Sequence, residues 1–131
     1  MIDRSLESLV FLFNASEGNY GIYDLLGELG RYHDETTEEK RVISSGIILE
    51  LCQMGYTYIQ TYLDFDFKNK GERIDNGSLE TLLRDVQNWK PNSMPLPCLE
   101  ITPVGEVYLD QAIKLRKSEF EHRILGIGKG T

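Results

Sequence analysis

The sequence predicts one α+β domain: three N-terminal helices, a small antiparallel sheet with an inserted helix, and a C-terminal helix. Two observations favour this order. Apolar residues recur at helical spacing in the first fifty positions, whereas residues 56–67 are rich in the aromatic and β-branched side chains of strands. A chain of 131 residues fits a single domain. We expect that domain to span residues 1–125, with an insertion at about 63–98 and a flexible glycine-rich tail at 126–131.

The N-terminal helices each have a separate signal. An apolar stripe predicts a first helix over residues 3–14, and a second stripe predicts a short helix over 22–29 that stops at Gly30. Thr36-Thr-Glu-Glu39 has the pattern of a capping box and starts the third helix, which should end near residues 54–55. Gly46 lies in the middle of that helix, where it costs about 1 kcal/mol relative to alanine. We therefore expect a close contact with another helix at Gly46.

The strand predicted over residues 56–67 has two different faces. Alternate residues from Thr57 to Phe67, including Leu63 and Phe65, form an apolar face that should pack on the core. The opposite face carries a tyrosine–acid ladder, which we define as Tyr56, Tyr58, Tyr62, Asp64 and Asp66.

The sequence pattern predicts fewer helices and strands in the second half of the chain. Residues 68–77 are polar and indicate a loop, after which Ser78 can cap a helix that runs to Trp89. A proline-rich connector follows, and residues 98–101 predict a short strand. Thr102-Pro103 has the pattern of an N-cap followed by an N1 proline, and it begins a last helix through Leu115.

Two junctions of the chain have a recognisable pattern. Residues 51–59 lead from the third predicted helix through a glycine into a strand, and Thr102-Pro-Val-Gly105 leads from a strand into the terminal helix. These junctions resemble the entry into the wing and the return from it in winged helix-turn-helix regulators of the MarR and PadR type. The resemblance implies a winged-helix fold whose third helix reads DNA. Such families keep a short basic wing where this chain has the 36 residues 63–98.

The distribution of charge opposes nucleic-acid binding. The net charge is −7, and residues 1–66 hold 12 acids against 4 bases. Residues 34–52, the segment that would contact DNA, carry five acids and only two bases, Lys40 and Arg41. Because lysine and arginine contacts supply most of the affinity for a polyanion, we expect a basic protein partner instead.

Catalytic, metal and cofactor chemistry has little support in the sequence. His33 and His122 are far apart, and no serine or cysteine stands in a recognisable nucleophile motif. The glycines at 126, 128 and 130 lack the following helix that a phosphate-binding loop needs. Cys52 and Cys98 have apolar neighbours and read as buried free thiols. We expect no enzyme activity, no cofactor, no metal, no membrane contact and a cytoplasmic location.

Two groups of residues are candidates for partner binding. The tyrosine–acid ladder combines large contact area with charge, although it could also be an ordinary half-solvated sheet face. An acidic cluster at the start of the third helix could steer a cationic partner, although acids in a first turn also complement the helix dipole. This cluster comprises Asp34, Glu35, Glu38 and Glu39.

Two functions remain as hypotheses from the sequence. The first is a bacterial immunity protein or antitoxin that occludes the basic cleft of a toxic nuclease domain, because size, acidity and the lack of catalytic groups resemble that class. The second is a winged-helix transcriptional regulator, dimerising through its first and last helices. It would contact DNA through the bases Lys40, Arg41, Lys68, Lys70 and Arg73. An accessory protein that uses the fold only for docking is a looser third option.

Overall fold

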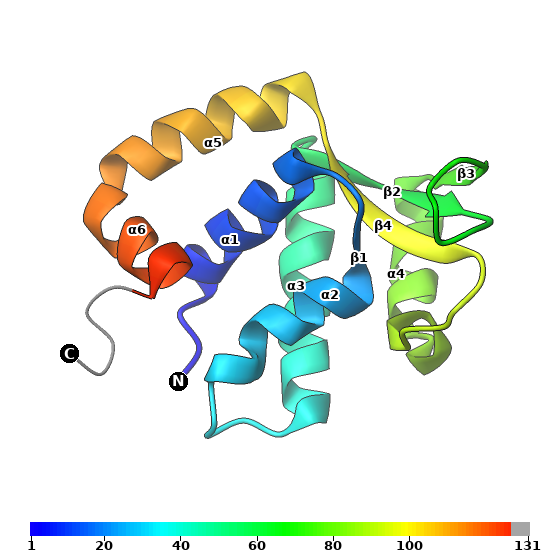
Figure 1. Ribbon diagram of the computed structural model, residues 1–131, viewed down its shortest axis with the longest axis horizontal. Coiled ribbons are helices and arrows are strands. Elements are labelled where there is room, and N and C mark those ends of the chain that lie inside the picture. Colours follow the sequence, from blue (N-terminus) through cyan, green and yellow to red (C-terminus); the bar gives the residue numbers. More distant parts are fainter. Residues whose placement is uncertain (127–131) are drawn as a thin grey trace.

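The computed structural model describes residues 1–126, which form an α+β fold of six helices and a four-stranded antiparallel sheet (Figure 1). The helices are α1 (Arg4–Glu17), α2 (Ile22–Glu28), α3 (Thr37–Gln53), α4 (Asn76–Arg84), α5 (Pro103–Leu115) and α6 (Lys117–Leu125). The strands are β1 (Tyr20–Gly21), β2 (Thr57–Tyr62), β3 (Lys70–Ile74) and β4 (Leu96–Ile101). Two 3-10 helices, η1 (Leu29–Arg31) and η2 (Val86–Trp89), follow α2 and α4.

The sheet has the strand order β1-β4-β2-β3, and one of its faces packs on the helices. Ile59 of β2 lies opposite Leu99 of β4, and both side chains are fully buried in the core. Helix α1 is the central helix, because it contacts α3, α5, α6 and β4 (Figure 1). Figure 1 shows α5 and α6 arching over α1, with the β2–β3 hairpin at the other side of the molecule.

Two predicted helix starts are confirmed in atomic detail. The Thr36 hydroxyl accepts a hydrogen bond from the Glu39 amide at 3.1 Å, and the Glu39 carboxylate accepts one from the Thr36 amide at 2.8 Å. Thr102 caps α5 in the same way through the Gly105 amide, at 3.0 Å. The contact expected at Gly46 is also present, because a Cβ there would stand 2.6 Å from the Arg4 guanidinium. That contact comes from a side chain of α1 rather than from a helix backbone.

The predictions for the middle of the chain were wrong in four places, one of which is that the helix expected to run to Trp89 ends at Arg84 and is followed by η2. Strand β2 ends at Tyr62, so residues 63–67 do not continue it, and the segment predicted as a polar loop contains strand β3. Asp75, not Ser78, is the N-cap of α4, because its carboxylate accepts a hydrogen bond from the Ser78 amide at 2.9 Å. The sheet therefore gains an edge strand that a search for apolar alternation misses, since β3 is almost entirely exposed.

The predicted single C-terminal helix is two helices. Helix α5 ends at Leu115 as expected, but the backbone leaves helical geometry at Arg116 and a second helix, α6, follows. Arg116 holds the break in place, since its guanidinium reaches the carboxylates of Asp3 at 3.1 Å and Glu119 at 2.7 Å. The predicted flexible tail, apart from Gly126, lies outside the described residues.

A buried ion pair attaches α6 to the centre of the fold. Glu7 of α1 is fully buried, and its two carboxylate oxygens accept hydrogen bonds from Arg123 of α6 at 2.7 and 2.8 Å. The Tyr32 hydroxyl donates a third hydrogen bond to Glu7 at 2.7 Å. Arg123 also donates to the backbone carbonyl of Glu28 at 2.9 Å. The charge of Glu7 is thus matched by an arginine, as a buried carboxylate requires.

Candidate functional site

Two of the predicted ladder tyrosines are engaged within the sheet. Tyr58 and Tyr62 lie on the face of β2 opposite the main core, where Tyr62 packs in a second, smaller cluster with Leu96 and Cys98. Both hydroxyls donate to the carboxylate of Glu100 on β4, the Tyr58 bond measuring 3.3 Å. The Arg73 guanidinium covers the Tyr58 ring at 3.9 Å from its centroid. Burial raises the pKa of both tyrosines, and Glu100 raises it further. The carboxylate that accepts hydrogen bonds from these tyrosines is therefore that of Glu100.

Sequence reasoning missed Glu100 because it pairs across strands. The sequence pattern places Glu100 in a predicted strand. The register that sets Glu100 opposite Tyr58, however, depends on long-range pairing. Tyr62 is only 6% exposed and offers little contact area. Tyr56 precedes β2, and its ring stacks on Tyr108 of α5 at a centroid distance of 4.3 Å. The three tyrosines thus do not form one exposed surface.

The remaining ladder residues, Asp64 and Asp66, lie in the turn between β2 and β3. The Asp64 carboxylate accepts hydrogen bonds from the Lys68 amide at 3.0 Å and from the Asn69 side chain at 2.5 Å. The bond from Lys68 is the main reason why the pKa of Asp64 is lowered. Asp64 therefore holds the turn, whereas Asp66 is exposed.

The same turn reverses the predicted direction of two apolar side chains. Leu63 and Phe65 were expected to pack on the core, but they are 58% and 54% exposed. Phe67 turns inward instead, and its ring packs edge-on against Tyr62 at 5.3 Å. Its positive φ of 58° marks a left-handed conformation that is rare for an aromatic residue. The turn thus presents two apolar side chains and one free carboxylate to solvent.

The acidic cluster at the start of α3 is mostly accounted for by local bonds. Glu39 completes the capping box, and Glu38 pairs with Arg41 at 2.5 Å. These bonds lower the pKa of both glutamates, chiefly through Arg41 for Glu38 and through the Thr36 amide for Glu39. Asp34 is 87% exposed, whereas the Glu35 side chain is 15% exposed. Figure 1 shows the first turn of α3 at the lower end of the molecule, well apart from the β2–β3 hairpin.

Helix α3 does not present its bases to solvent. Arg41 is 15% exposed and donates to the Leu83 carbonyl of α4 at 3.3 Å as well as to Glu38. Lys40 is half-buried. The exposed side of α3 instead carries Glu38, Glu39 and Glu50 together with Val42, and α4 packs along the helix (Figure 1). This arrangement is unfavourable for contact with a phosphate backbone.

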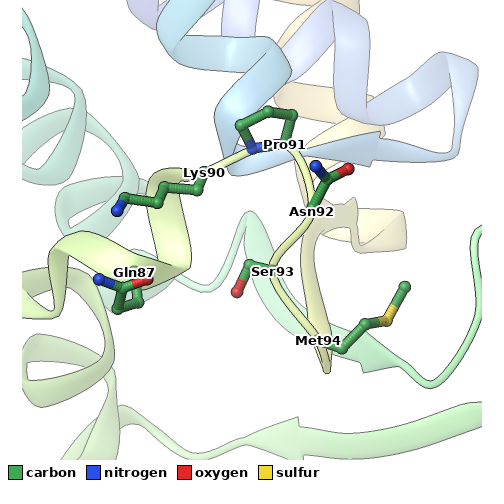
Figure 2. Close-up of a pocket in the computed structure, with 6 residues that line it drawn as sticks. All are labelled: Gln87, Lys90, Pro91, Asn92, Ser93 and Met94. Atoms are coloured by element: carbon green, nitrogen blue, oxygen red, sulfur yellow. The ribbon is translucent and has the colours of Figure 1, made fainter.

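The described residues offer no cluster of metal-binding side chains. Within residues 1–126 there is no group of three or more His, Cys, Asp or Glu side chains with the geometry to hold a metal ion. Both cysteines are free and buried, and burial raises the pKa of Cys98 to about 12, which keeps it protonated at neutral pH. A hollow of about 420 Å³ is lined by Gln87 and residues 90–94, but Figure 2 shows Met94 directed away from Gln87 and Lys90. The side chains that line this hollow do not point toward one common position.

Comparisons with known proteins give no relative. No protein-family model, curated protein or solved structure matches this chain. Among the helices of residues 1–126, none has the length and apolar character needed to cross a membrane.

Proposed function

We propose that the chain is a small acidic protein-binding module with a basic protein partner. The observation that supports this best is the exposed side of α3, which carries three glutamates while Arg41 is turned toward α4. The β2–β3 turn adds Asp66 beside the exposed Leu63 and Phe65. Carboxylates beside exposed apolar side chains suit a protein surface that is rich in lysine and arginine.

The most fitting partner of this kind is the nuclease domain of a bacterial toxin. A nuclease needs a basic cleft to hold a polyanion, and an acidic protein can occupy that cleft in place of the substrate. The chain would then serve as an immunity protein or antitoxin that neutralises the toxin by occlusion. Its net charge of −7 would speed the encounter.

The first test is affinity capture of the chain from host lysate, with and without nuclease treatment. We expect one basic protein in stoichiometric amount, retained after nuclease and released by salt. Glu50→Lys on α3 and Asp66→Lys in the turn should each weaken capture at least about tenfold, a loss of about 1.4 kcal/mol. Glu106→Lys on the exposed side of α5 is the matched control and should leave capture unchanged.

Asp64 is not a suitable test residue, because its replacement removes the bonds that hold the turn. Recovery of DNA fragments with no protein surviving nuclease would contradict the proposal. Equal capture by all three lysine variants would contradict the assignment of these acids to the contact.

A winged-helix DNA-binding regulator is the alternative. The order of elements favours it, because α1, β1, α2, α3, β2 and β4 follow one another with β4 between β1 and β2 in the sheet. In this case β3 and α4 stand inside the wing, and the exposed bases are Lys68, Lys70 and Arg73, of which Arg73 stacks on the Tyr58 ring. A gel-shift assay against host genomic fragments tests it. Salt-sensitive retention that is lost in Lys68→Glu with Lys70→Glu would favour the regulator.

A homodimer is part of that alternative, and the structure restricts where it could form. Helix α1 is mostly buried against α3, α5, α6 and β4, so it offers little surface for the interface expected from the sequence. Helix α5 retains exposed apolar residues, with Val104, Val107 and Leu115 at 61%, 59% and 86% exposure. We expect the dimer of such a regulator to use this side of α5, and light scattering of wild type against Val107→Glu tests it.

A further inference from the structure

Helices α3 and α4 leave an open apolar groove between them. The groove has a volume of about 300 Å³, and its apolar part is made by Val42 and Leu49 of α3 and Leu83 of α4. Leu83 is buried, but Val42 is 56% exposed, so solvent reaches part of this apolar surface. The groove is therefore available to an apolar side chain from another molecule.

The charged residues that line this groove are predominantly basic. Two arginines and one glutamate belong to the lining: Arg41, Arg84 and Glu80. Arg84 pairs with Glu80, but the two side chains are 78% and 60% exposed, and ion pairs at the surface are weak. Arg41 is 15% exposed and is paired with Glu38. Arg84 is therefore the cation that an incoming carboxylate can reach, and its guanidinium can also lie on the face of an aromatic ring.

The turn between β2 and β3 presents an aromatic side chain between two carboxylates. Phe65 is 54% exposed, and it stands between Asp64 and Asp66 in the sequence. The turn is held from within, because Asp64 accepts hydrogen bonds from the Lys68 amide and the Asn69 side chain. Phe65 is thus held in an exposed position before any partner arrives, which lowers the entropy cost of binding. The residues of this turn do not belong to the lining of the groove in their own chain.

We propose that the chain associates with a second copy of itself, with the Phe65 side chain of one copy placed in the α3–α4 groove of the other. The ring would lie on the apolar surface that includes Val42 and Leu83. The Asp66 carboxylate beside the ring would reach Arg84. An aromatic side chain next to a carboxylate is the chemistry that an apolar groove with an accessible arginine favours, and this turn supplies it.

The contact can form twice between two copies. Figure 1 shows the β2–β3 hairpin and α4 at the same side of the molecule, which is the arrangement that a reciprocal exchange of turns requires. Glu80, the one carboxylate of the lining, is matched by the exposed Lys68 at the end of the turn. The exchange would hide the turn from solvent, so a basic partner that uses Asp66 would compete with the second copy.

The first experiment is sedimentation velocity of the purified chain at increasing concentration. It is made at about 0.15 M salt, where the like net charges of −7 on two copies are screened beyond about 8 Å. We expect a concentration-dependent dimer. Phe65→Ser and Val42→Glu should each weaken it at least about tenfold, because the first removes the inserted ring and the second places a carboxylate where the ring would lie.

Val86→Glu is the matched control for Val42→Glu. Val86 is similarly exposed, at 51%, but it lies in η2 outside the groove, so this variant should associate as wild type. A wild-type chain that stays monomeric at millimolar concentration would overturn the inference. A dimer that is lost in Val107→Glu on α5 and kept in Phe65→Ser would overturn it as well.

A second measurement identifies which two surfaces meet. Phe65→Ser keeps its groove intact and Val42→Glu keeps its turn intact, so a mixture of the two variants can form one contact that neither variant forms alone. We expect the mixture to associate more tightly than either variant by itself, and thermal unfolding confirms that both are folded. Equal association in the mixture and in the separate variants would overturn the inference. Because both measurements use the purified chain, their failure leaves the proposed basic partner to be tested by capture from host lysate.

Discussion

At the scale of single residues, the fold depends most on the buried pair of Glu7 and Arg123. Glu7 has no exposed surface, and Arg123 is 9% exposed, so solvent cannot replace either partner. Removing one member of such a pair is expected to cost about 3–5 kcal/mol, because the other charge stays buried without compensation. That is a large share of the roughly 5–15 kcal/mol by which a domain is stable.

We therefore predict that Arg123→Met lowers the free energy of unfolding in urea by about 3–5 kcal/mol. The double variant Glu7→Leu with Arg123→Met should recover much of this loss, because the fully buried carboxylate is then removed together with its cation. The Glu28 carboxylate, which is 28% exposed and also lies 3.4 Å from Arg123, keeps its hydrogen bond from Asn14 and its access to solvent. A single Arg123→Met that unfolds like wild type would show that water reaches Glu7.

The alkaline limit of stability is set in part by Tyr32. Burial, followed by the hydrogen bond to Glu7, raises the pKa of Tyr32 from 10.0 to about 12. The native state thus holds its proton more tightly than the unfolded state. The stabilisation is fully present below pH 10 and is lost as the pH rises from 10 to about 12. Urea unfolding at several pH values should show a weaker decline in Tyr32→Phe than in wild type, and equal declines would contradict the shift.

At the scale of elements, the junction between β2 and α5 leaves no space for another atom. A Cβ on Gly105 would stand 2.1 Å from the backbone carbonyl oxygen of Tyr56, and that carbonyl also accepts a hydrogen bond from the Thr102 amide at 2.9 Å. Neither backbone segment can move without disturbing both elements. The close approach positions α5 against the entrance of β2.

Gly105→Ala is therefore predicted to destabilise the fold by about 3 kcal/mol, at the upper end of overpacking effects. Gly27→Ala in α2 is the matched control, because nothing lies within 4 Å of its added Cβ. That control should be neutral or stabilise by up to about 1 kcal/mol, as expected for alanine in a helix. The comparison is made by thermal unfolding of the two variants, and equal shifts would contradict the close contact.

Elements that depend on local sequence were predicted well, and those that depend on distant pairing were not. The capping box at Thr36 and the cap at Thr102 require only residues within one turn. Strand β3 is a strand only because it pairs with β2, and its exposed residues carry no apolar alternation. Strand β2 ends at Tyr62 because Asp64 stabilises a turn there, although the residues that follow Tyr62 are of types that favour a strand.

The same distinction explains the candidate site. The acids at the start of α3 could be recognised from sequence, but their partners within the chain could not, because Arg41 also contacts α4. The tyrosine–acid ladder was inferred from alternation along one strand. Its real acid, Glu100, comes from the neighbouring strand 38 residues away from Tyr62. The exposure of Leu63 and Phe65 depends on the geometry of the turn. The residue types at these two positions do not indicate it.

At the scale of the whole molecule, net charge should govern how fast a partner is met. With a charge of −7, association with a basic protein should slow markedly between about 0.05 and 0.5 M salt, as the screening length falls below about 10 Å. Dissociation should change far less, because apolar contacts are not screened. Surface plasmon resonance with the captured partner measures both rates. An association rate independent of salt would contradict electrostatic steering.

The ion pair between α1 and α6 also bears on how the chain is made. Glu7 and Arg123 are 116 residues apart, so a ribosome adding about 5–20 residues per second needs roughly 6–23 s between them. During that time the nascent α1 carries a carboxylate that cannot be enclosed without its counter-charge. Until then the apolar side of α1 is exposed to solvent or bound by a chaperone. The core can therefore be completed only after α6 has left the ribosomal exit tunnel.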